Sequence, residues 1–350
     1  MSRVYLDWNA TAPLRPEARA AMADAMDLIG NPSSVHAEGR AAKMLLERAR
    51  EAVAQAAGAQ AADVIFTSGA TEAAALVMTG RGLASSAIEH DAVRAWSDDS
   101  LPADDGGRVA VPDPSRAALQ MANSETGVLQ DLPQGLAVSD LTQAFGKVPF
   151  AFDWLGIEAG FVSAHKLGGP KGIGALIVRK GTDVQARIRG GGQEQGRRAG
   201  TENLIGIAGF AAAATAAQGD LASGSAEKQA ELRDRLQNAL DIDDENTMYP
   251  GRASRRLPQT LSILTPGWKG ETQVMQMDLA GFAVSAGSAC SSGKVRPSGV
   301  LRAMGVPEAD AACALRVSFG RATTAEELDR FADAWLTARS RWRSKQGKTG

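Results

Sequence analysis

Hydrophobic positions in this chain change their spacing several times between runs of strand length and runs at helical spacing. The strand-like runs lie at 63–67, 161–162, 172–178, 260–264 and 282–285. Apolar positions at helical spacing, with capping residues around them, predict helices over about 16–30, 37–57, 73–78, 204–218, 227–240, 271–279 and 325–341. Around Gly219 to Gly224 the composition turns to Gly, Ser and Asp, and we place a domain boundary there.

Composition narrows the possible functions. The chain has 350 residues, and 38 Lys and Arg nearly balance 40 Asp and Glu, so no global charge favours nucleic acid or an anionic membrane. No apolar run is expected to reach the ~20 residues of a membrane span, and the N-terminus shows no signal-peptide pattern. Two cysteines and three histidines exclude a disulfide framework and argue against a metal cluster. We therefore expect a cytoplasmic protein without a metal site.

The stretch from Ser163 to Gly172 is the most informative in the chain. It reads as a strand, a tight glycine-rich turn and a second strand, with Lys166 held on the turn next to His165. A lysine in such a place can form a Schiff base with the aldehyde of pyridoxal 5'-phosphate (PLP). The alternative is a surface loop with two solvated lysines, Lys166 and Lys171.

A second stretch, from Ser68 to Glu72, joins a strand to an apolar helix. Free backbone N–H groups and the helix dipole favour an anion at such a junction, and Thr71 adds a hydroxyl. The alternative is an ordinary capping box around Thr71. The glycine-rich loop at 189–201, with Arg197 and Arg198, is also able to approach an anion, although a flexible linker reads similarly.

Acidic, basic and thiol groups complete the candidate chemistry. Asp140 and Asp153 both qualify locally to hold a pyridinium nitrogen, although most such aspartates cap helices. His90 stands where a strand gives way to a helix, a place where a lone histidine is usually structural. Arg316 lies in an apolar strand and needs an anionic partner, either a structural carboxylate or a substrate carboxylate.

The two cysteines differ in their surroundings. Cys290 is flanked by small, polar and glycine residues, which favour an exposed mobile loop and a reactive thiol. Cys313 lies in an apolar stretch typical of inert packing.

Taken together, the motifs resemble those of the cysteine desulfurases, PLP enzymes of the class V aminotransferase group. Seven markers occur in the family's order along nearly the whole chain. They are Gly30-Asn31-Pro32-Ser33-Ser34, Phe66 to Glu72, Glu89-His90, Ser163 to Lys171, Arg198 to Thr201, Ser288-Ala289-Cys290 and Arg316 to Arg321.

The resemblance implies an α/β protein of PLP fold-type I that forms a homodimer. Its large domain, here 15–220, would hold a mostly parallel sheet of the seven-stranded type between helices. A smaller α+β domain, here 1–14 with 221–350, would carry the mobile cysteine loop.

It also implies a role for each matching residue. Lys166 would hold PLP and later move the Cα proton, Asp140 rather than Asp153 would pair with the ring nitrogen, and Gln143 would contact the ring hydroxyl. His90 would stack on the ring and take part in catalysis. The phosphate would lie among Ala70, Thr71, Ser163 and His165, with Thr201 reaching the phosphate of the neighbouring subunit. Arg316, Ser124 and Asn9 would bind the substrate.

The implied reaction is that of a sulfurtransferase. L-cysteine would be converted to L-alanine while the thiolate of Cys290 takes the sulfur as a persulfide. A sulfur-acceptor protein for iron–sulfur clusters or thio-cofactors would then receive it. Selenocysteine lyase, another class V PLP enzyme and a degenerate homologue that acts as a binding partner are the alternatives.

Two departures from the family pattern bear on activity. Ser124 stands where the family has an asparagine, and its shorter side chain is not expected to make the same contact. Asn123 is adjacent, but it would point the other way in an extended segment. The stretches from His90 to Asn123 and from Gly127 to Asp140 are shorter than in the family.

Overall fold

The computed structural model describes residues 3–241, 246–287 and 296–346. Its helices are α1 (Pro16–Met26), α2 (Ala37–Ala56), α3 (Ala70–Met78), α4 (Asp91–Arg94), α5 (Phe152–Leu155), α6 (Leu204–Ala222), α7 (Ser225–Leu240), α8 (Gly270–Leu279), α9 (Gly299–Ala303), α10 (Glu308–Ala311) and α11 (Ala325–Gln346). Its strands are β1 (Val4–Tyr5), β2 (Ala62–Thr67), β3 (Leu83–Ser86), β4 (Ser97–Leu101), β5 (Val138–Asp140), β6 (Ala159–Ser163), β7 (Gly174–Arg179), β8 (Thr260–Leu264), β9 (Phe282–Ala283) and β10 (Ala314–Ser318). Short 3₁₀ turns occur at Pro114–Arg116 (η1), Ala164–Lys166 (η2) and Gln193–Gly196 (η3).

The central sheet runs in the order β2-β7-β6-β5. Strand β7 is antiparallel to both of its neighbours, whereas β5 and β6 are parallel. Beyond β5, parallel bridges through Ala117 and Ala118 lead to β3, which pairs in parallel with β4. The sheet is therefore mixed but mostly parallel, which confirms the expected fold class.

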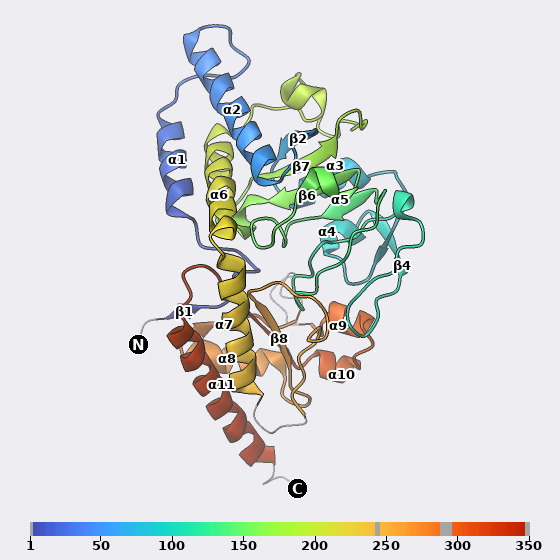
Figure 1. Ribbon diagram of the computed structural model, residues 1–350, viewed down its shortest axis with the longest axis vertical. Coiled ribbons are helices and arrows are strands. Elements are labelled where there is room, and N and C mark those ends of the chain that lie inside the picture. Colours follow the sequence, from blue (N-terminus) through green and yellow to red (C-terminus); the bar gives the residue numbers. More distant parts are fainter. Residues whose placement is uncertain (1–2, 242–245, 288–295, 347–350) are drawn as a thin grey trace.

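Helices cover this sheet on both faces, and the strand residues alternate between them (Figure 1). In β7, Ala175 and Ile177 face the core made with α2 and α6, while Leu176 and Val178 face the core made with α3. This two-residue alternation is what a sheet buried on both sides requires.

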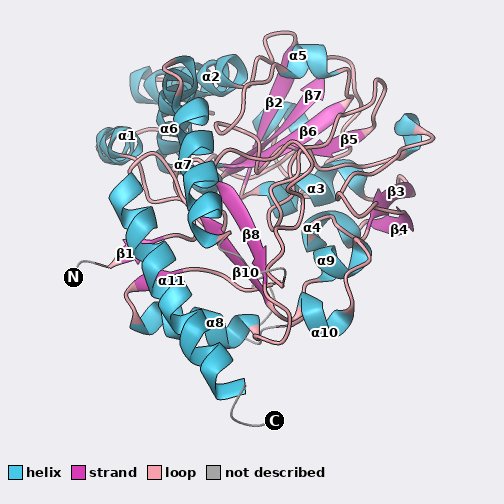
Figure 2. Cartoon of the chain, turned by 60° about the horizontal axis from the view of Figure 1, so that its bottom comes forward, coloured by secondary structure: helices cyan, strands magenta, loops and turns pink. Residues whose placement is uncertain are grey.

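Apart from the two cores of the sheet, another hydrophobic core lies around β8 and β10, which pair antiparallel beside α7 and α11 (Figure 2). The N-terminal residues Val4 and Leu6 belong to this core, since β1 pairs with β9 and Asp7 bridges to Ser318. Helices α6 and α7 are separated at Gly224, which adopts a left-handed conformation with φ of 80°. The division into 15–220 and 1–14 with 221–350 remains our proposal.

Several predicted bounds differ from the structure. Helix α1 ends at Met26 rather than near Gly30, while α11 continues five residues past Arg341 to Gln346. Helix α6 reaches Ala222 rather than Gln218, and it packs against α1 and α2. Contrary to our expectation, α6 is long and apolar enough to cross a membrane, judged by its length and composition alone. Half of its apolar stretch is buried inside the protein.

Candidate active site

A set of mostly polar residues from distant parts of the chain lines one cavity of about 680 Å³. Of the residues predicted for the site, it brings together Asn9, Ala70, Thr71, His90, Ser124, Asp140, Gln143, Ser163, His165, Lys166 and Arg316. They arrive from the N-terminal segment, from the ends of β2, β5 and β6, from the start of α4 and from β10. The cavity thus lies at one edge of the sheet, where the loops that follow these strands meet.

The junction between β2 and α3 forms one wall. Helix α3 begins directly after Gly69 without a side-chain cap, so Thr71 is the second residue of the helix and not its cap. Glu72 accepts a hydrogen bond from the backbone N of Ser68 at 2.8 Å and pairs with Arg198 at 2.9 Å. Burial raises the pKa of Glu72, but these hydrogen bonds outweigh it and leave the pKa below its usual value. The start of α3 is therefore firmly held and open to an anion.

Ser163 and His165 approach the same wall from the end of β6. The Nδ1 atom of His165 lies 3.2 Å from the Oγ1 atom of Thr11. Burial, together with the charges of Lys166, Lys171 and Lys147, lowers the pKa of His165 to about 4. The imidazole is therefore neutral at physiological pH.

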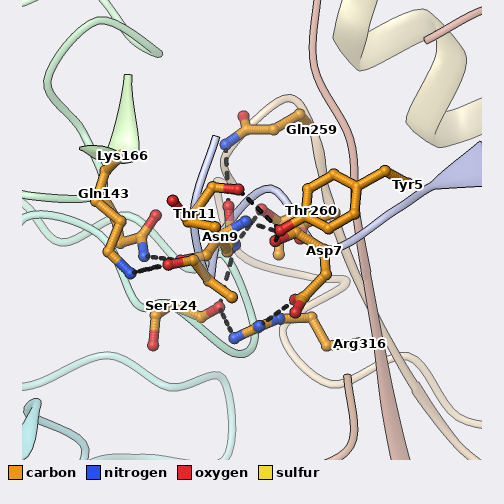
Figure 3. Close-up of polar contacts among 12 residues, drawn as sticks. Tyr5, Asp7, Asn9, Thr11, Ser124, Gln143, Lys166, Gln259, Thr260 and Arg316 are labelled. Atoms are coloured by element: carbon orange, nitrogen blue, oxygen red, sulfur yellow. Dashed lines mark hydrogen bonds and ion pairs between the residues drawn. The ribbon is translucent and has the colours of Figure 1, made fainter. Parts of the chain in front are cut away.

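Lys166 ends the turn η2 and extends its ammonium into the cavity. Its Nζ donates to the backbone oxygens of Asn9 at 2.7 Å and Ala10 at 3.0 Å. Both acceptors belong to the N-terminal segment, more than 150 residues away in the chain, so the position of the lysine depends on tertiary contacts (Figure 3).

Asp140 is the last residue of β5, and Gln143 follows in the turn after it. The Oδ1 atom of Asp140 accepts a hydrogen bond from the backbone N of Thr142 at 2.8 Å. The Nε2 atom of Gln143 donates to the backbone oxygen of Asn9 at 3.0 Å. Asp153, the competing candidate, does not line the cavity, and its Oδ2 accepts from the backbone N of Ala61 at 3.0 Å.

His90 both lines the cavity and caps α4. Its Nδ1 accepts from the backbone N of Ala92 at 3.0 Å, so a neutral imidazole carries its proton on Nε2. Glu89 beside it is 4% exposed and accepts from the backbone N of Gln120 at 2.7 Å. Burial raises the pKa of Glu89 well above its usual value, and Asp140 and Asp99 add to the effect. The structural and the functional interpretations of His90 are thus compatible.

Arg316, on β10, is 7% exposed and has an internal partner that the sequence left open. Its Nη2 lies 2.7 Å from Asp7 Oδ1, and its Nη1 donates to the backbone oxygen of Ser124 at 3.1 Å. Its buried Nε atom finds no hydrogen-bond acceptor among the described residues. The guanidinium therefore retains an unused donor next to the cavity.

Asn9, 1% exposed, connects these groups (Figure 3). Its Nδ2 donates to the Ser124 oxygen at 3.1 Å and to Thr260 Oγ1 at 2.9 Å, and its Oδ1 accepts from Lys147 at 3.3 Å. The Asn9 side chain is thus fully engaged within the protein. A contact with substrate remains a prediction.

Sequence reasoning missed Asp7, Lys147 and Thr260. Asp7 stands in the N-terminal segment near Asn9, and Lys147 follows Gln143 by four residues, but neither spacing indicates which distant element it meets. Asn123, in contrast, turns its side chain away from the cavity, where its Oδ1 accepts from the backbone N atoms of Glu125 and Thr126 at 2.9 Å.

Two predicted residues are not placed in the cavity. Thr201 is exposed and does not line it. Cys290 lies outside the described residues. Cys313 is buried, with a pKa raised by burial, as expected for a packing residue.

The loop before Thr201 is held to the sheet. Glu194, with φ of 49°, accepts from Arg50 at 2.6 Å and from the backbone N of Phe66 at 2.9 Å. Together with the pair between Arg198 and Glu72, this ties the glycine-rich loop to both β2 and α3. A flexible linker would not be fixed in this way.

Comparisons with known proteins agree with this arrangement. A family model described as aminotransferase class-V matches residues 4–98 and 107–331. A cysteine desulfurase from Cereibacter sphaeroides is 39% identical over an alignment 371 positions long, which covers 95% of each chain. A solved NifS-like protein from Rickettsia africae superposes with a TM-score of 0.87 and 30% identity, covering 97% of this chain and 99% of that one. The structure described as SspA in complex with cysteine gives a TM-score of 0.76 and 26% identity, with 91% and 99% covered.

The chain therefore belongs to the class V aminotransferases and, within them, to the cysteine desulfurase family. Members of this group are PLP enzymes.

Proposed function

We propose that this protein is a PLP-dependent cysteine desulfurase, which converts L-cysteine to L-alanine and retains the sulfur on Cys290. The observation that carries the proposal is the meeting of Lys166, Asp140 and the start of α3 in one cavity. A related solved structure, SspA, is described as a complex with cysteine.

The residues of the cavity fit PLP group by group. The start of α3, with Thr71, Ser163 and the neutral His165, suits the phosphate. Asp140 suits a protonated ring nitrogen, Gln143 suits the ring hydroxyl, and the Lys166 amine suits the aldehyde. When bound, PLP supplies an electron sink for loss of the Cα proton.

The chain's own residues supply binding and proton transfer. Lys166 would hold the cofactor and, once the substrate amine has displaced it, take the Cα proton at Nζ. Arg316 would bind the substrate carboxylate, because its planar guanidinium is suited to a carboxylate and it already lines the cavity. His90 would lie over the ring, since it lines the cavity together with Gln120 and Asp140.

The sulfur step belongs to Cys290. Its thiolate would form a bond with the substrate sulfur as the bond between that sulfur and the substrate Cβ breaks, which leaves a persulfide on the protein. The electron pair of the broken bond would stay with the carbon fragment, and Cβ would take up a proton to become the methyl group of alanine. We further propose a homodimer in which Thr201 reaches the neighbouring site, a cytoplasmic location, and a protein acceptor for iron–sulfur or thio-cofactor assembly.

One observation favours a second candidate, a homologue of low activity that serves as a binding partner. Ser124 lines the cavity, but the contacts found for it use its backbone oxygen, which accepts from Asn9 and Arg316. A missing side-chain contact at this position would lower turnover.

The deciding experiment measures alanine and sulfide formed from L-cysteine in the presence of a thiol reductant, with Cys290→Ala alongside. Turnover by the wild type that disappears in the variant supports the desulfurase and its nucleophile together. Bound PLP without turnover in either protein would favour the binding partner instead.

A further inference from the structure

Lys147 is a buried amine next to the active site for which neither the sequence nor the proposed reaction supplies a role. It ends the turn that follows β5, and its Nζ donates to Gln143 Oε1 and, at 3.3 Å, to Asn9 Oδ1. Both acceptors are side-chain amides that line the cavity, whereas Lys147 itself does not line it.

The surroundings of the Lys147 amine are unusual for a lysine. Among the described residues, no carboxylate lies within ion-pair distance of Lys147, and the nearby charges are those of Lys166 and Arg316. Burial, reinforced by these two cations, lowers the pKa of Lys147 well below its usual value. A buried amine without an ion pair costs stability, so its presence calls for a reason other than stability.

The chemistry of the contact supplies that reason. The Lys147 amine donates to the oxygen of the Gln143 amide, so this oxygen faces Lys147. The Gln143 Nε2 then faces the opposite way, where it donates to the Asn9 backbone oxygen near the Lys166 amine. A reversed amide would place N–H groups against the ammonium and an oxygen against the Asn9 carbonyl.

We propose that Lys147 is a positioning residue that orients the Gln143 amide, so that Nε2–H is presented to the group bound at Lys166. This inference rests on the proposed function, since that group is PLP. It assigns to Lys147 no contact with PLP or substrate, and it makes Gln143 the residue through which Lys147 acts.

The test is a double-mutant cycle on the holoenzyme with Lys147→Met, Gln143→Ala and the double variant. The dissociation constant of PLP is measured by dialysis against graded PLP, and the visible absorbance of bound PLP is recorded for each protein. Lys228→Met on the exposed face of α7 is the matched control, with no change expected.

If Lys147 acts through Gln143, each single variant weakens PLP binding by about tenfold, and the double variant is no worse than Gln143→Ala within about twofold. The absorbance band moves in the same direction in all three. The inference is overturned if the two single effects on the dissociation constant multiply in the double variant. It is also overturned if Lys147→Met binds PLP as tightly as wild type.

If Lys147→Met does not fold, Lys147→Gln replaces it, and we expect a smaller weakening of PLP binding. A glutamine side chain both donates and accepts hydrogen bonds, so it no longer fixes the orientation of the Gln143 amide. Wild type that binds no PLP overturns the proposed function and this inference together. Multiplied effects with PLP bound overturn the inference alone.

Discussion

The Asp7 carboxylate and the Arg316 guanidinium form an ion pair of 2.7 Å that joins the N-terminal segment to β10 beside the cavity. Both side chains are mostly buried, and Arg316 also donates to the Ser124 backbone oxygen. The arginine is thus held in a fixed orientation before any substrate arrives. This pre-organisation lowers the cost of binding a carboxylate.

Arg316→Gln is expected to raise the KM for L-cysteine by about a hundredfold, because a charge-assisted contact with the substrate carboxylate is lost. Steady-state kinetics against L-cysteine measure it. Asp7 then remains as an unpaired carboxylate, so the double variant Asp7→Asn with Arg316→Gln should unfold at a higher temperature than Arg316→Gln alone. An unchanged KM would remove Arg316 from substrate binding.

Lys166→Ala is expected to abolish the PLP adduct that borohydride reduction traps on the protein. The reason is that Lys166 lines the cavity together with Asp140 and the start of α3, and that its amine is held there by the Asn9 and Ala10 backbone oxygens. Mass spectrometry after reduction gives the measurement, and Lys171→Ala, at the mouth of the same cavity, should retain the adduct. A reducible adduct in Lys166→Ala would show that another amine holds PLP.

Ser124→Asn is expected to raise the turnover of L-cysteine. An asparagine side chain at this position reaches further into the cavity than a serine hydroxyl, while the backbone oxygen that binds Asn9 and Arg316 is retained. Alanine formation per bound PLP is the measurement. Equal or lower turnover would mean that Ser124 is not a handicap.

His165 makes stability depend on pH. Its pKa of about 4 in the folded protein lies below the 6.5 of an unfolded histidine, so the unfolded chain binds the proton first. The stabilising contribution of the neutral imidazole to the free energy of unfolding is therefore fully present above pH 6.5. It is lost as the pH falls towards about 4, and no further loss occurs below that pH. For this partly exposed group we expect a loss of about 1 kcal/mol after allowance for solvent screening.

Urea unfolding of PLP-free wild type and PLP-free His165→Gln at pH 7.5 and pH 5.0 isolates this effect. The difference in unfolding free energy between the two pH values should be smaller in the variant, because the other titrating groups are shared. Equal differences in the two proteins would show that His165 titrates normally.

The sequence alone determined the local structure around the site. Turn residues and apolar runs near Lys166 predicted a strand, a turn and a strand because these features depend on near neighbours in the chain. The markers of the family, including Ser68 to Glu72 and Arg198 to Thr201, could likewise be recognised because they are short, contiguous motifs. Bounds such as the end of α1 were less accurate, since capping and packing compete there.

Tertiary structure alone decided which distant groups meet. Asn9 contacts Lys166, Ser124 and Thr260, which lie between 115 and 251 positions away in the chain. Two pairings depend on how β1, β8 and β10 pack against the loops of the sheet. One joins Asp7 to Arg316, and the other joins Lys147 to Gln143 and Asn9. No local pattern encodes such contacts, because they form only when the N-terminal segment, packed in the core around β8 and β10, meets the loops of the sheet.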